Sequence, residues 1–378
     1  MVAAVVEIDK SEDPRDVVFR AVAALAEGKV VAFPTETVYG VAASALNSQA
    51  VNRLMEAKGR SFDKPLALAV KSADDALDYV PNMTQLARRL ARRCWPGPLT
   101  LVLEYDHNNS VISRLPKSVQ NLVVPTGAVG LRVPANSVAL QVLRLSAGPL
   151  VLTSANRSGE PDTSSGQQVM DQIGDKIDLI IDGGPSDYGA SSSVIRIDDS
   201  GINILREGVV DRATIEKMSI FQALVVCTGN TCRSPMGEML LKQQLSEKLD
   251  CPIDNLEENG IQVLSAGIAA MPGGQPSPQS VDAMAQRGID LSPHSSQPVS
   301  ESMVKSADII LTMTNTHRAA LLHQWPELHG RTHVVNQDGS DVSDPIGHGA
   351  EVYEQCALQI EKQMEAWSAV IIDQKKQT

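Results

Sequence analysis

The sequence predicts an α/β fold in two domains, and three observations support this expectation. The chain has 378 residues, which suits two domains of about 150 residues each. Short apolar runs rich in β-branched residues alternate with helical patterns along the whole length, as in α/β proteins. The net charge of −12 divides into about −3 before residue 211 and about −9 after it, so the two halves differ in character.

The elements and the domain boundary follow from these patterns. Apolar runs predict strands at 30–33, 99–103, 150–153, 179–181, 224–226 and 309–313. Helical patterns are found at 16–27, 50–57, 84–93, 236–248, 278–286 and 349–368. A turn at 206–208 is followed by a polar helical stretch and then by a fresh strand. We therefore expect a first domain at 1–210, a linker at 211–221 and a second domain at 222–378.

The composition narrows the class of protein. No window approaches about 18 consecutive apolar residues, so a membrane span is not expected. The first ten residues contain Glu7 and Asp9 and lack a basic stretch, which argues against a secretory signal. The five cysteines are odd in number and sparse, which favours free thiols in a reducing compartment. We expect a cytoplasmic protein, and its acidic charge is not that of a general nucleic-acid binder.

The strongest motif lies at the start of the second domain. An apolar strand runs into Cys227-Thr-Gly-Asn-Thr-Cys-Arg233-Ser234-Pro235, and a helical pattern follows at once. A strand, a short loop and a helix N-terminus point several backbone N–H groups at one spot, which suits an anion. Such a site favours the thiolate of Cys227, and the Arg233 guanidinium can hold two phosphoryl oxygens. The alternative is that the motif has no catalytic role and that its two cysteines only pack as a buried pair at the end of a strand.

This segment resembles the low-molecular-weight protein phosphatase family over about residues 222–372. The resemblance implies that Cys227 is the nucleophile, that Arg233 binds the phosphate, and that Asp344 of a late Asp-Pro pair is the general acid and later the base. It also implies a doubly wound parallel sheet of four strands, a reaction without a metal, and phosphoprotein substrates. Further residues would brace or support the phosphate loop: Thr228, Gly229, Asn230, Thr231, Cys232, Ser234 and Ser265.

Two positions bear on the choice of substrate. Tyrosine-specific relatives carry a bulky aliphatic residue where this chain has Thr231, and tyrosines follow their Asp-Pro pair where this chain has Ile346. Without those rings a phosphotyrosine loses its stacking wall. The loop resembles that of the bacterial protein-arginine phosphatases, although Ile346 departs from the aromatic residue expected there too. Phosphoarginine is therefore the expected substrate, and phosphotyrosine is the alternative.

The loop holds a second thiol, Cys232, five residues after Cys227. In the family that the segment resembles, such a pair closes a reversible disulfide that protects the nucleophile from over-oxidation. The alternative is a small residue that only packs. An arsenate reductase of this fold would need paired cysteines downstream, whereas Cys251 and Cys356 lie far apart in the sequence.

The first domain carries three polar clusters, at 34–40, 58–60 and 153–159, each at the end of an expected strand or helix. Ligand sites are usually built at such ends. Lys58 and Arg60 are able to bracket a triphosphate, and the alternative is an ordinary helix end. No Walker-type loop with Gly-Lys-Ser/Thr is present, which excludes a P-loop ATPase. The residues alone predict a groove for a phosphate ligand.

Together with 95–100, 130–134 and 191–193, these clusters resemble the YrdC-like threonylcarbamoyl-AMP synthase family over about residues 5–210. The resemblance implies a twisted mixed sheet with helices, and a reaction of L-threonine, bicarbonate and ATP that gives threonylcarbamoyl-AMP and pyrophosphate. Mg²⁺ would accompany the ATP, and a tRNA-modifying transferase complex would be the partner. L-threonine would lie beside Thr35 and Thr37. The nucleotide would be bound by Lys58, Arg60, Ser154, Asn156, Ser193 and Arg206.

Other functions of the first domain stay open. It is either a synthase or a module that only binds RNA, tethered to the phosphatase. Four arginines on an expected helix, at positions 88, 89, 92 and 93, suit double-stranded RNA, or they form a solvated helix face. A carbamoyl-transfer role as in hydrogenase maturation would need acylphosphatase and zinc-finger segments, and the sequence has no paired Cys-x2-Cys motifs. Longer synthases carry a different C-terminal domain in the place that the phosphatase takes here.

Overall fold

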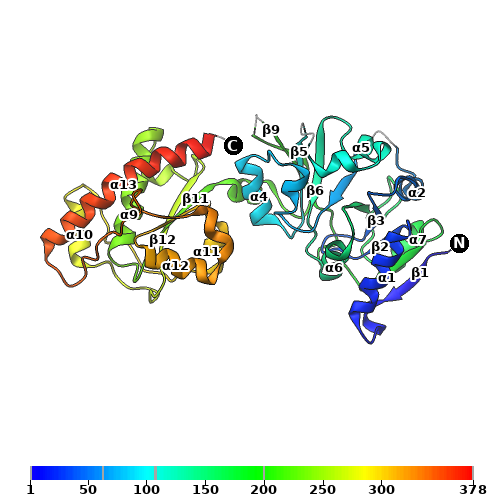
Figure 1. Cartoon of the computed structure of the whole chain (residues 1–378), viewed down its shortest axis with the longest axis horizontal. Coiled ribbons are helices and arrows are strands. Elements are labelled where there is room, and N and C mark those ends of the chain that lie inside the picture. The colour runs from blue at the N-terminus through cyan, green and yellow to red at the C-terminus, as the bar shows by residue number, and fades with distance from the viewer. Residues whose placement is uncertain (1, 62–63, 106–108, 199–200, 377–378) are drawn as a thin grey trace. The chain divides into compact units, whose positions relative to one another are not determined.

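The computed structural model describes residues 2–61, 64–105, 109–198 and 201–376 (Figure 1). The chain forms two compact units, which divide between Glu216 and Lys217. No helix in the described ranges is long and apolar enough to cross a membrane.

The first unit is built on a mixed sheet, and the described residues give it ten strands in the order β1-β8-β2-β3-β7-β4-β6-β5-β9-β10. The sheet contains parallel pairs, such as β5 with β9, and antiparallel pairs, such as β3 with β7. The strands are β1 (Ala4–Glu7), β2 (Val31–Phe33), β3 (Gly40–Ser44), β4 (Ala67–Ala69), β5 (Leu99–Glu104), β6 (Ala128–Arg132), β7 (Leu150–Ser154), β8 (Leu179–Asp182), β9 (Ser193–Asp198) and β10 (Gly201–Arg206).

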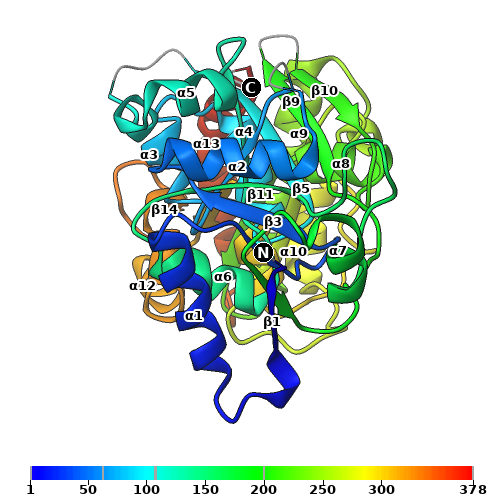
Figure 2. The ribbon, with the colours of Figure 1, turned by 90° about the vertical axis from the view of Figure 1, so that its right-hand side faces the viewer.

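Helices α1 (Pro14–Ala26) and α6 (Ser137–Leu145) lie side by side against one face of this sheet (Figure 2). Helix α1 begins where the Asp13 carboxylate accepts a hydrogen bond from the Arg15 backbone N–H, with Pro14 in the first turn. Its apolar stripe packs on β2, β3 and β8. The unit also contains α2 (Ser48–Lys58), α3 (Ala76–Tyr79), α4 (Gln85–Cys94), α5 (Lys117–Val123), α7 (Gly166–Ile173) and α8 (Arg212–Ser219), which crosses the division.

The second unit has an all-parallel sheet, with four strands in the described residues in the order β12-β11-β13-β14. They are β11 (Phe221–Cys227), β12 (Ile261–Gly267), β13 (Ile309–Thr312) and β14 (Thr332–Val334). Helices α9 (Arg233–Leu249) and α13 (Ala350–Lys376) pack on one face, and α11 (Glu301–Ser306) and α12 (Asn315–Gln324) on the other (Figure 1). Helix α10 (Pro278–Ala285) contacts α13.

The expected fold class is confirmed in both units: a mixed sheet with helices, then a doubly wound parallel sheet of four strands. In a parallel sheet the carboxyl ends of all strands meet at one edge, where ligands bind. Cys227 at the end of β11 stands in register with Gly267 at the end of β12. The fold therefore places the thiol at the edge where this class of sheet builds its sites.

Two candidate active sites

The phosphate loop of the second unit spans 228–232, between the end of β11 and the start of α9. Its left-handed residue is Asn230, with φ of 53°, whereas Gly229 has no positive φ and a Cβ there would meet only Thr231 Oγ1, at 3.6 Å. The glycine that the loop requires is Gly267. A Cβ on it would stand 2.5 Å from the Thr228 carbonyl oxygen, so only glycine lets β12 approach the loop this closely.

The nucleophile candidate Cys227 is buried, with two hydrogen-bonding groups around its sulfur. The Ser234 hydroxyl lies 2.9 Å from Sγ, and the Asn230 backbone N–H donates to it at 3.3 Å. The Asn230 side-chain amide donates to Ser234 Oγ at 2.9 Å, and the one hydroxyl proton of Ser234 faces both the sulfur and the Ala266 carbonyl oxygen, which lies 3.3 Å away. These two contacts fix the position of the sulfur at the base of the loop.

Asn230 braces the loop through its side chain, which is fully buried. Its amide also donates to Ser265 Oγ at 2.9 Å, and its Oδ1 accepts the Gln297 backbone N–H at 2.9 Å. Ser265 in turn donates to Glu238 at 2.6 Å. The predicted residues Asn230, Ser234 and Ser265 thus form one hydrogen-bonded network beneath the sulfur.

The guanidinium of Arg233 is buried and faces Asp344, although 111 residues separate them. Arg233 Nη2 lies 2.5 Å from Asp344 Oδ2, and Nη1 donates to the Val342 carbonyl at 3.2 Å. The Asp344 side chain is 46% exposed, so one side of the carboxylate is open to an incoming molecule. The structure therefore brings together the cysteine, arginine and aspartate that the sequence singled out.

The sequence interpretation missed His317, which is buried behind the loop. Its Nε2 lies 2.8 Å from Thr228 Oγ1, and its Nδ1 lies 2.9 Å from Thr314 Oγ1. Burial, and then the positive charge of Arg233, lower the pKa of His317, so its ring is neutral at pH 7 and orients the Thr228 hydroxyl. No motif signalled this residue, because the contact joins two distant segments.

The second loop thiol, Cys232, is buried beside Tyr353 of α13, whose hydroxyl lies 3.5 Å from its sulfur. Burial, and then the neighbouring thiol, raise the pKa of Tyr353. Thr231 Oγ1 lies 3.7 Å from Cys232 Sγ. Cys356, one turn further along α13, donates to the Ser343 carbonyl at 3.7 Å, and burial raises its pKa to about 12. Cys356 is therefore a neutral thiol at physiological pH.

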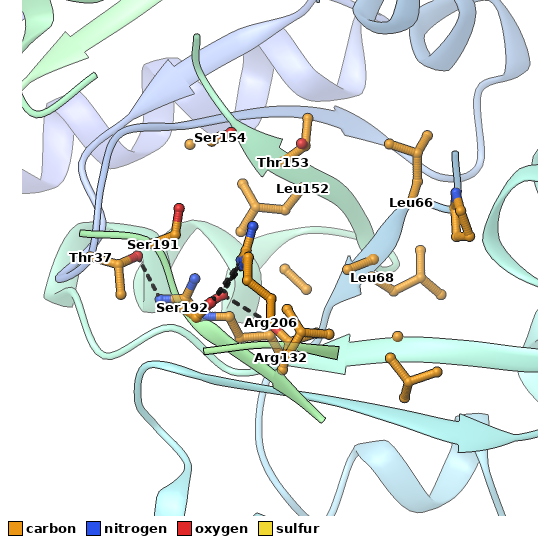
Figure 3. A pocket seen from close by; sticks show the side chains of 18 of the residues that line it. Thr37, Leu66, Leu68, Arg132, Leu152, Thr153, Ser154, Ser191, Ser192 and Arg206 are labelled. Carbon is orange, nitrogen blue, oxygen red and sulfur yellow. Dashed lines mark hydrogen bonds between the residues drawn. The ribbon is translucent and has the colours of Figure 1, made fainter. Parts of the chain in front are cut away.

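In the first unit the predicted residues gather around a groove of about 410 Å³ (Figure 3). Hydroxyl and guanidinium groups of Thr37, Ser191, Ser192, Arg132 and Arg206 lie on one side, and Leu66 and Leu68 lie across from them. Five of the predicted residues line the groove: Thr35, Thr37, Arg60, Ser154 and Arg206. A cavity with apolar walls and a few convergent polar groups is typical of a small-molecule site.

The other three predicted residues, Lys58, Asn156 and Ser193, lie behind the wall of the groove. Lys58 Nζ donates to the carbonyl oxygens of Ser154 and Asn156 and to Asn156 Oδ1. Burial, and then the charge of Arg60, lower its pKa to about 8. Ser193 Oγ donates to the Val210 carbonyl at 2.6 Å. These side chains hold turns in place, so they shape the groove from outside it.

Arg60 and Arg206 carry the electrostatic signature of an anion site. Burial lowers the pKa of both guanidinium groups, and the charge of Arg206 further lowers that of Arg60. Arg60 Nε is buried and has no hydrogen-bond partner in the described part of the chain, whereas Arg206 donates to the Ser192 carbonyl at 2.7 Å. Two partly solvent-exposed cations that repel each other are stabilised by an anion between them.

Thr35 and Thr37 form a hydroxyl pair, with 2.9 Å between their Oγ1 atoms. Thr37 Oγ1 also accepts a hydrogen bond from Arg132 Nη2 at 2.9 Å, and the same nitrogen lies 2.7 Å from Glu36 Oε1. The buried pair of Glu36 and Arg132 was not among the predicted site residues. The stretch 130–134 was noticed in the sequence, but nothing local showed that its arginine points at the threonines.

Comparisons with known proteins divide the chain at the same place as the fold. Residues 23–208 match the family model Sua5_yciO_yrdC, described as telomere recombination. Residues 222–377 match the model described as low molecular weight phosphotyrosine protein phosphatase.

Named relatives match the first part. The chain is 42% identical over 195 residues to the threonylcarbamoyl-AMP synthase of Pyrococcus abyssi, covering 51% of this chain and 54% of the relative. It is 36% identical over 198 residues to a putative threonylcarbamoyl-AMP synthase of Mycobacterium tuberculosis, covering 52% of this chain and 87% of the relative. The chain thus spans 54% and 57% of the length of the Pyrococcus and Bacillus subtilis relatives.

Two solved structures are among those similar to the chain. A mutant of Pyrococcus abyssi Sua5 is 25% identical, with a TM-score of 0.51, and covers 82% of this chain and 98% of its own. The YwlE arginine phosphatase from Geobacillus stearothermophilus is 29% identical, with a TM-score of 0.35, and covers 40% of this chain and 94% of its own.

Proposed function

Because the chain belongs to the Sua5–YciO–YrdC family of threonylcarbamoyl-AMP synthases and carries a low-molecular-weight phosphatase domain, we propose that it is a bifunctional enzyme. The synthase domain would take residues 1–210 and the phosphatase domain 222–378, with 211–221 as the linker. The observation that carries the proposal is the pair of separate anion sites: the Arg60 and Arg206 groove, and the Cys227 loop with Arg233.

The first activity is the formation of threonylcarbamoyl-AMP and pyrophosphate from L-threonine, bicarbonate and ATP. Arg60 and Arg206 would take the triphosphate, since their mutual repulsion favours an anion between them. Arg132 would hold the threonine carboxylate next to the hydroxyls of Thr35 and Thr37. Catalysis would rest on positioning and charge stabilisation, without a protein nucleophile.

Ser154 would contact the nucleotide directly, because it lines the groove. Lys58, Asn156 and Ser193 would act on nucleotide binding mainly by fixing the turns behind it. Mg²⁺ would accompany ATP, yet the described residues hold no cluster of three metal-ligating side chains. The ion would be held chiefly by the phosphates, as is usual for Mg²⁺ bound with a nucleotide.

The second activity is hydrolysis of a phosphoprotein through a cysteinyl-phosphate. The phosphoryl group would displace the Asp344 carboxylate from Arg233 and bind the guanidinium and the loop N–H groups. Cys227 Sγ would attack phosphorus while Asp344 gives a proton to the leaving atom. Asp344 would then take a proton from the water that cleaves the S–P bond, which releases phosphate and restores the thiolate.

Phosphoarginine fits this site better than phosphotyrosine. The Thr231 hydroxyl stands on the loop where a bulky aliphatic residue would favour an aromatic ring, and the side chain after Asp344-Pro345 is Ile346, which is 65% exposed. Neither residue offers a ring to stack on a tyrosine. A paired assay tests this, with phosphoarginine and phosphotyrosine in the same peptide, and a higher kcat/KM for phosphotyrosine would refute the assignment.

Pyrophosphate release tests the first activity. We expect release that needs ATP, L-threonine and bicarbonate together, and a product that a tRNA-modifying transferase accepts. No release at saturating substrate would reduce the first domain to an RNA-binding module, in which case double-stranded RNA should bind. We also propose that the enzyme works in the cytoplasm, where tRNA and phosphoproteins are both present.

A further inference from the structure

A second cavity of about 410 Å³ lies in the phosphatase unit, at the outer edge of its sheet. It is bounded by β14, the edge strand, by Asn315 and Arg318 of α12, and by Trp367 and Val370 of α13. These two helices cover opposite faces of the sheet (Figure 1). The cavity therefore opens around the free edge of β14 and takes no part in the chemistry described above.

One buried acceptor in the wall of this cavity is without a partner. Asn336 is 3% exposed, and its Oδ1 has no hydrogen-bond partner among the described residues. Its orientation is fixed by its neighbours: Ser340 Oγ gives its one proton to Asp338, at 2.6 Å, and so must accept from Asn336 Nδ2, at 3.0 Å. If the amide were flipped, Asn336 Oδ1 would face Ser340 Oγ, and neither oxygen would have a proton to donate to the other. Oδ1 is thus a buried acceptor that the described residues leave without a donor.

The other walls supply a cation and an apolar surface. Arg318 Nε donates to the Thr332 carbonyl at 3.0 Å, which fixes the guanidinium and leaves its terminal nitrogens for a ligand. Burial, and then the charge of Arg318, lower the pKa of His333, so Arg318 is the cation of this wall at pH 7. Trp367 stacks at a tilt on His333, with 5.3 Å between ring centroids, and Val370 lies beside it in the lining.

A short segment of the chain connects the rim of the cavity to the catalytic edge of the sheet. The rim residue Gly339 lies five residues before Asp344, so the two are at most about 17 Å apart along the chain. The intervening segment is anchored at both ends: Asp341 accepts from the Asn315 backbone N–H at 2.7 Å, and the Val342 carbonyl accepts from Arg233. An extended peptide of about five residues would span from the phosphate loop to this cavity.

We propose that this cavity is an accessory subsite for the phosphoprotein, which binds an acidic segment of the substrate within about five residues of the phosphorylated side chain. The inference rests on the proposed phosphatase function and deepens it. A carboxylate of the segment pairs with Arg318, a backbone N–H donates to Asn336 Oδ1, and the aliphatic part of a side chain lies on Trp367 and Val370. Substrate choice then depends on sequence around the phosphoresidue as well as on the phosphoresidue itself.

Binding is measured first, on the full chain carrying Cys227→Ser, by calorimetry with phosphoarginine peptides flanked by glutamates or by glutamines. We expect the glutamate peptide to bind about fivefold tighter than the glutamine peptide, because it forms one additional charge pair with the half-buried guanidinium of Arg318. This advantage disappears in Arg318→Met, which keeps the aliphatic stem, and in Val370→Glu, which adds a repelling charge. Lys248→Met removes an exposed charge from α9 of the same unit and retains the advantage.

Turnover is measured next, as the ratio of kcat/KM for the glutamate peptide to kcat/KM for a small aryl phosphate. The ratio falls about fivefold in Arg318→Met and does not change in Lys248→Met. An equal glutamate advantage in all four chains overturns the proposal. If the chain with Cys227 intact hydrolyses no substrate, the phosphatase function is refuted. The binding measurements on the Cys227→Ser chain then still decide whether the cavity is a subsite.

Discussion

Asn230 offers a test of how the phosphate loop is held. Its side chain is fully buried and makes three hydrogen bonds of 2.9 Å, to Ser234, Ser265 and the Gln297 backbone. Its backbone is left-handed, with φ of 53°. Asn230→Ala removes the bonds and also puts a Cβ without a polar group in a conformation that L-residues avoid. Asn230→Gly removes the same bonds but tolerates that backbone.

The magnitude follows from these contacts. Each lost hydrogen bond costs about 1 kcal/mol, so both variants should destabilise the loop by roughly 3 kcal/mol. The left-handed backbone adds about 1 kcal/mol for alanine and nothing for glycine. Because 1.4 kcal/mol corresponds to a factor of ten, the loop should open roughly a hundredfold more often in Asn230→Gly and about fivefold more often again in Asn230→Ala.

Hydrogen exchange of the amides around Cys227 measures this opening directly. Phosphatase kcat/KM should fall with it, by about tenfold or more, because the N–H groups that hold the phosphoryl oxygens lose their fixed positions. Asn259→Ala, which removes a single exposed amide contact in the same unit, serves as the control. Exchange and kcat/KM equal to those of the unaltered chain would refute the bracing role. Equal exchange in the alanine and glycine variants would refute the backbone argument.

Three further predictions concern the two activities. Cys227→Ser should abolish phosphatase turnover and leave pyrophosphate release within about twofold; equal loss of both would show that the sites are coupled. Thr231→Ile should shift the kcat/KM ratio toward phosphotyrosine by about tenfold, whereas an unchanged ratio would contradict the specificity argument. Burial lowers the pKa of Lys58 to about 8, so its charge is lost as the pH rises through that value, and ATP affinity measured by calorimetry should weaken above it. Lys58→Arg should remove this pH dependence, and identical profiles for the two chains would exclude Lys58 as its source.

Local signals in the sequence predicted most of what is local in the structure. The strand, loop and helix around Cys227 are contiguous, so their order alone indicated an anion site. The long β-branched runs correspond to β2, β5, β7, β8, β11 and β13. Strand β3, with glycine and alanine in most positions, and β4, with three residues, lack that signal and owe their conformation to their neighbours in the sheet.

Contacts between distant segments could not be predicted from the residues alone. Thr228 meets His317 and Thr37 meets Arg132 only because the sheets bring their strands together. The pairing of Arg233 with Asp344 was expected solely from the family pattern, since 111 residues separate them. Lys58 looked like a ligand-binding cation in the sequence, but the structure uses its ammonium group to tie a turn.

The cysteinyl-phosphate is the intermediate on which the proposed phosphatase mechanism depends. A substrate labelled in its phosphoryl group, mixed with the full chain and quenched in acid within one turnover, should leave label on the peptide that contains Cys227. The Cys227→Ser chain should carry no thiophosphate. With an activated aryl phosphate, whose leaving group needs no proton from Asp344, Asp344→Asn should accumulate more of the labelled intermediate because its hydrolysis lacks a base. Substrate turnover without any label on Cys227 would contradict the mechanism proposed for the second domain.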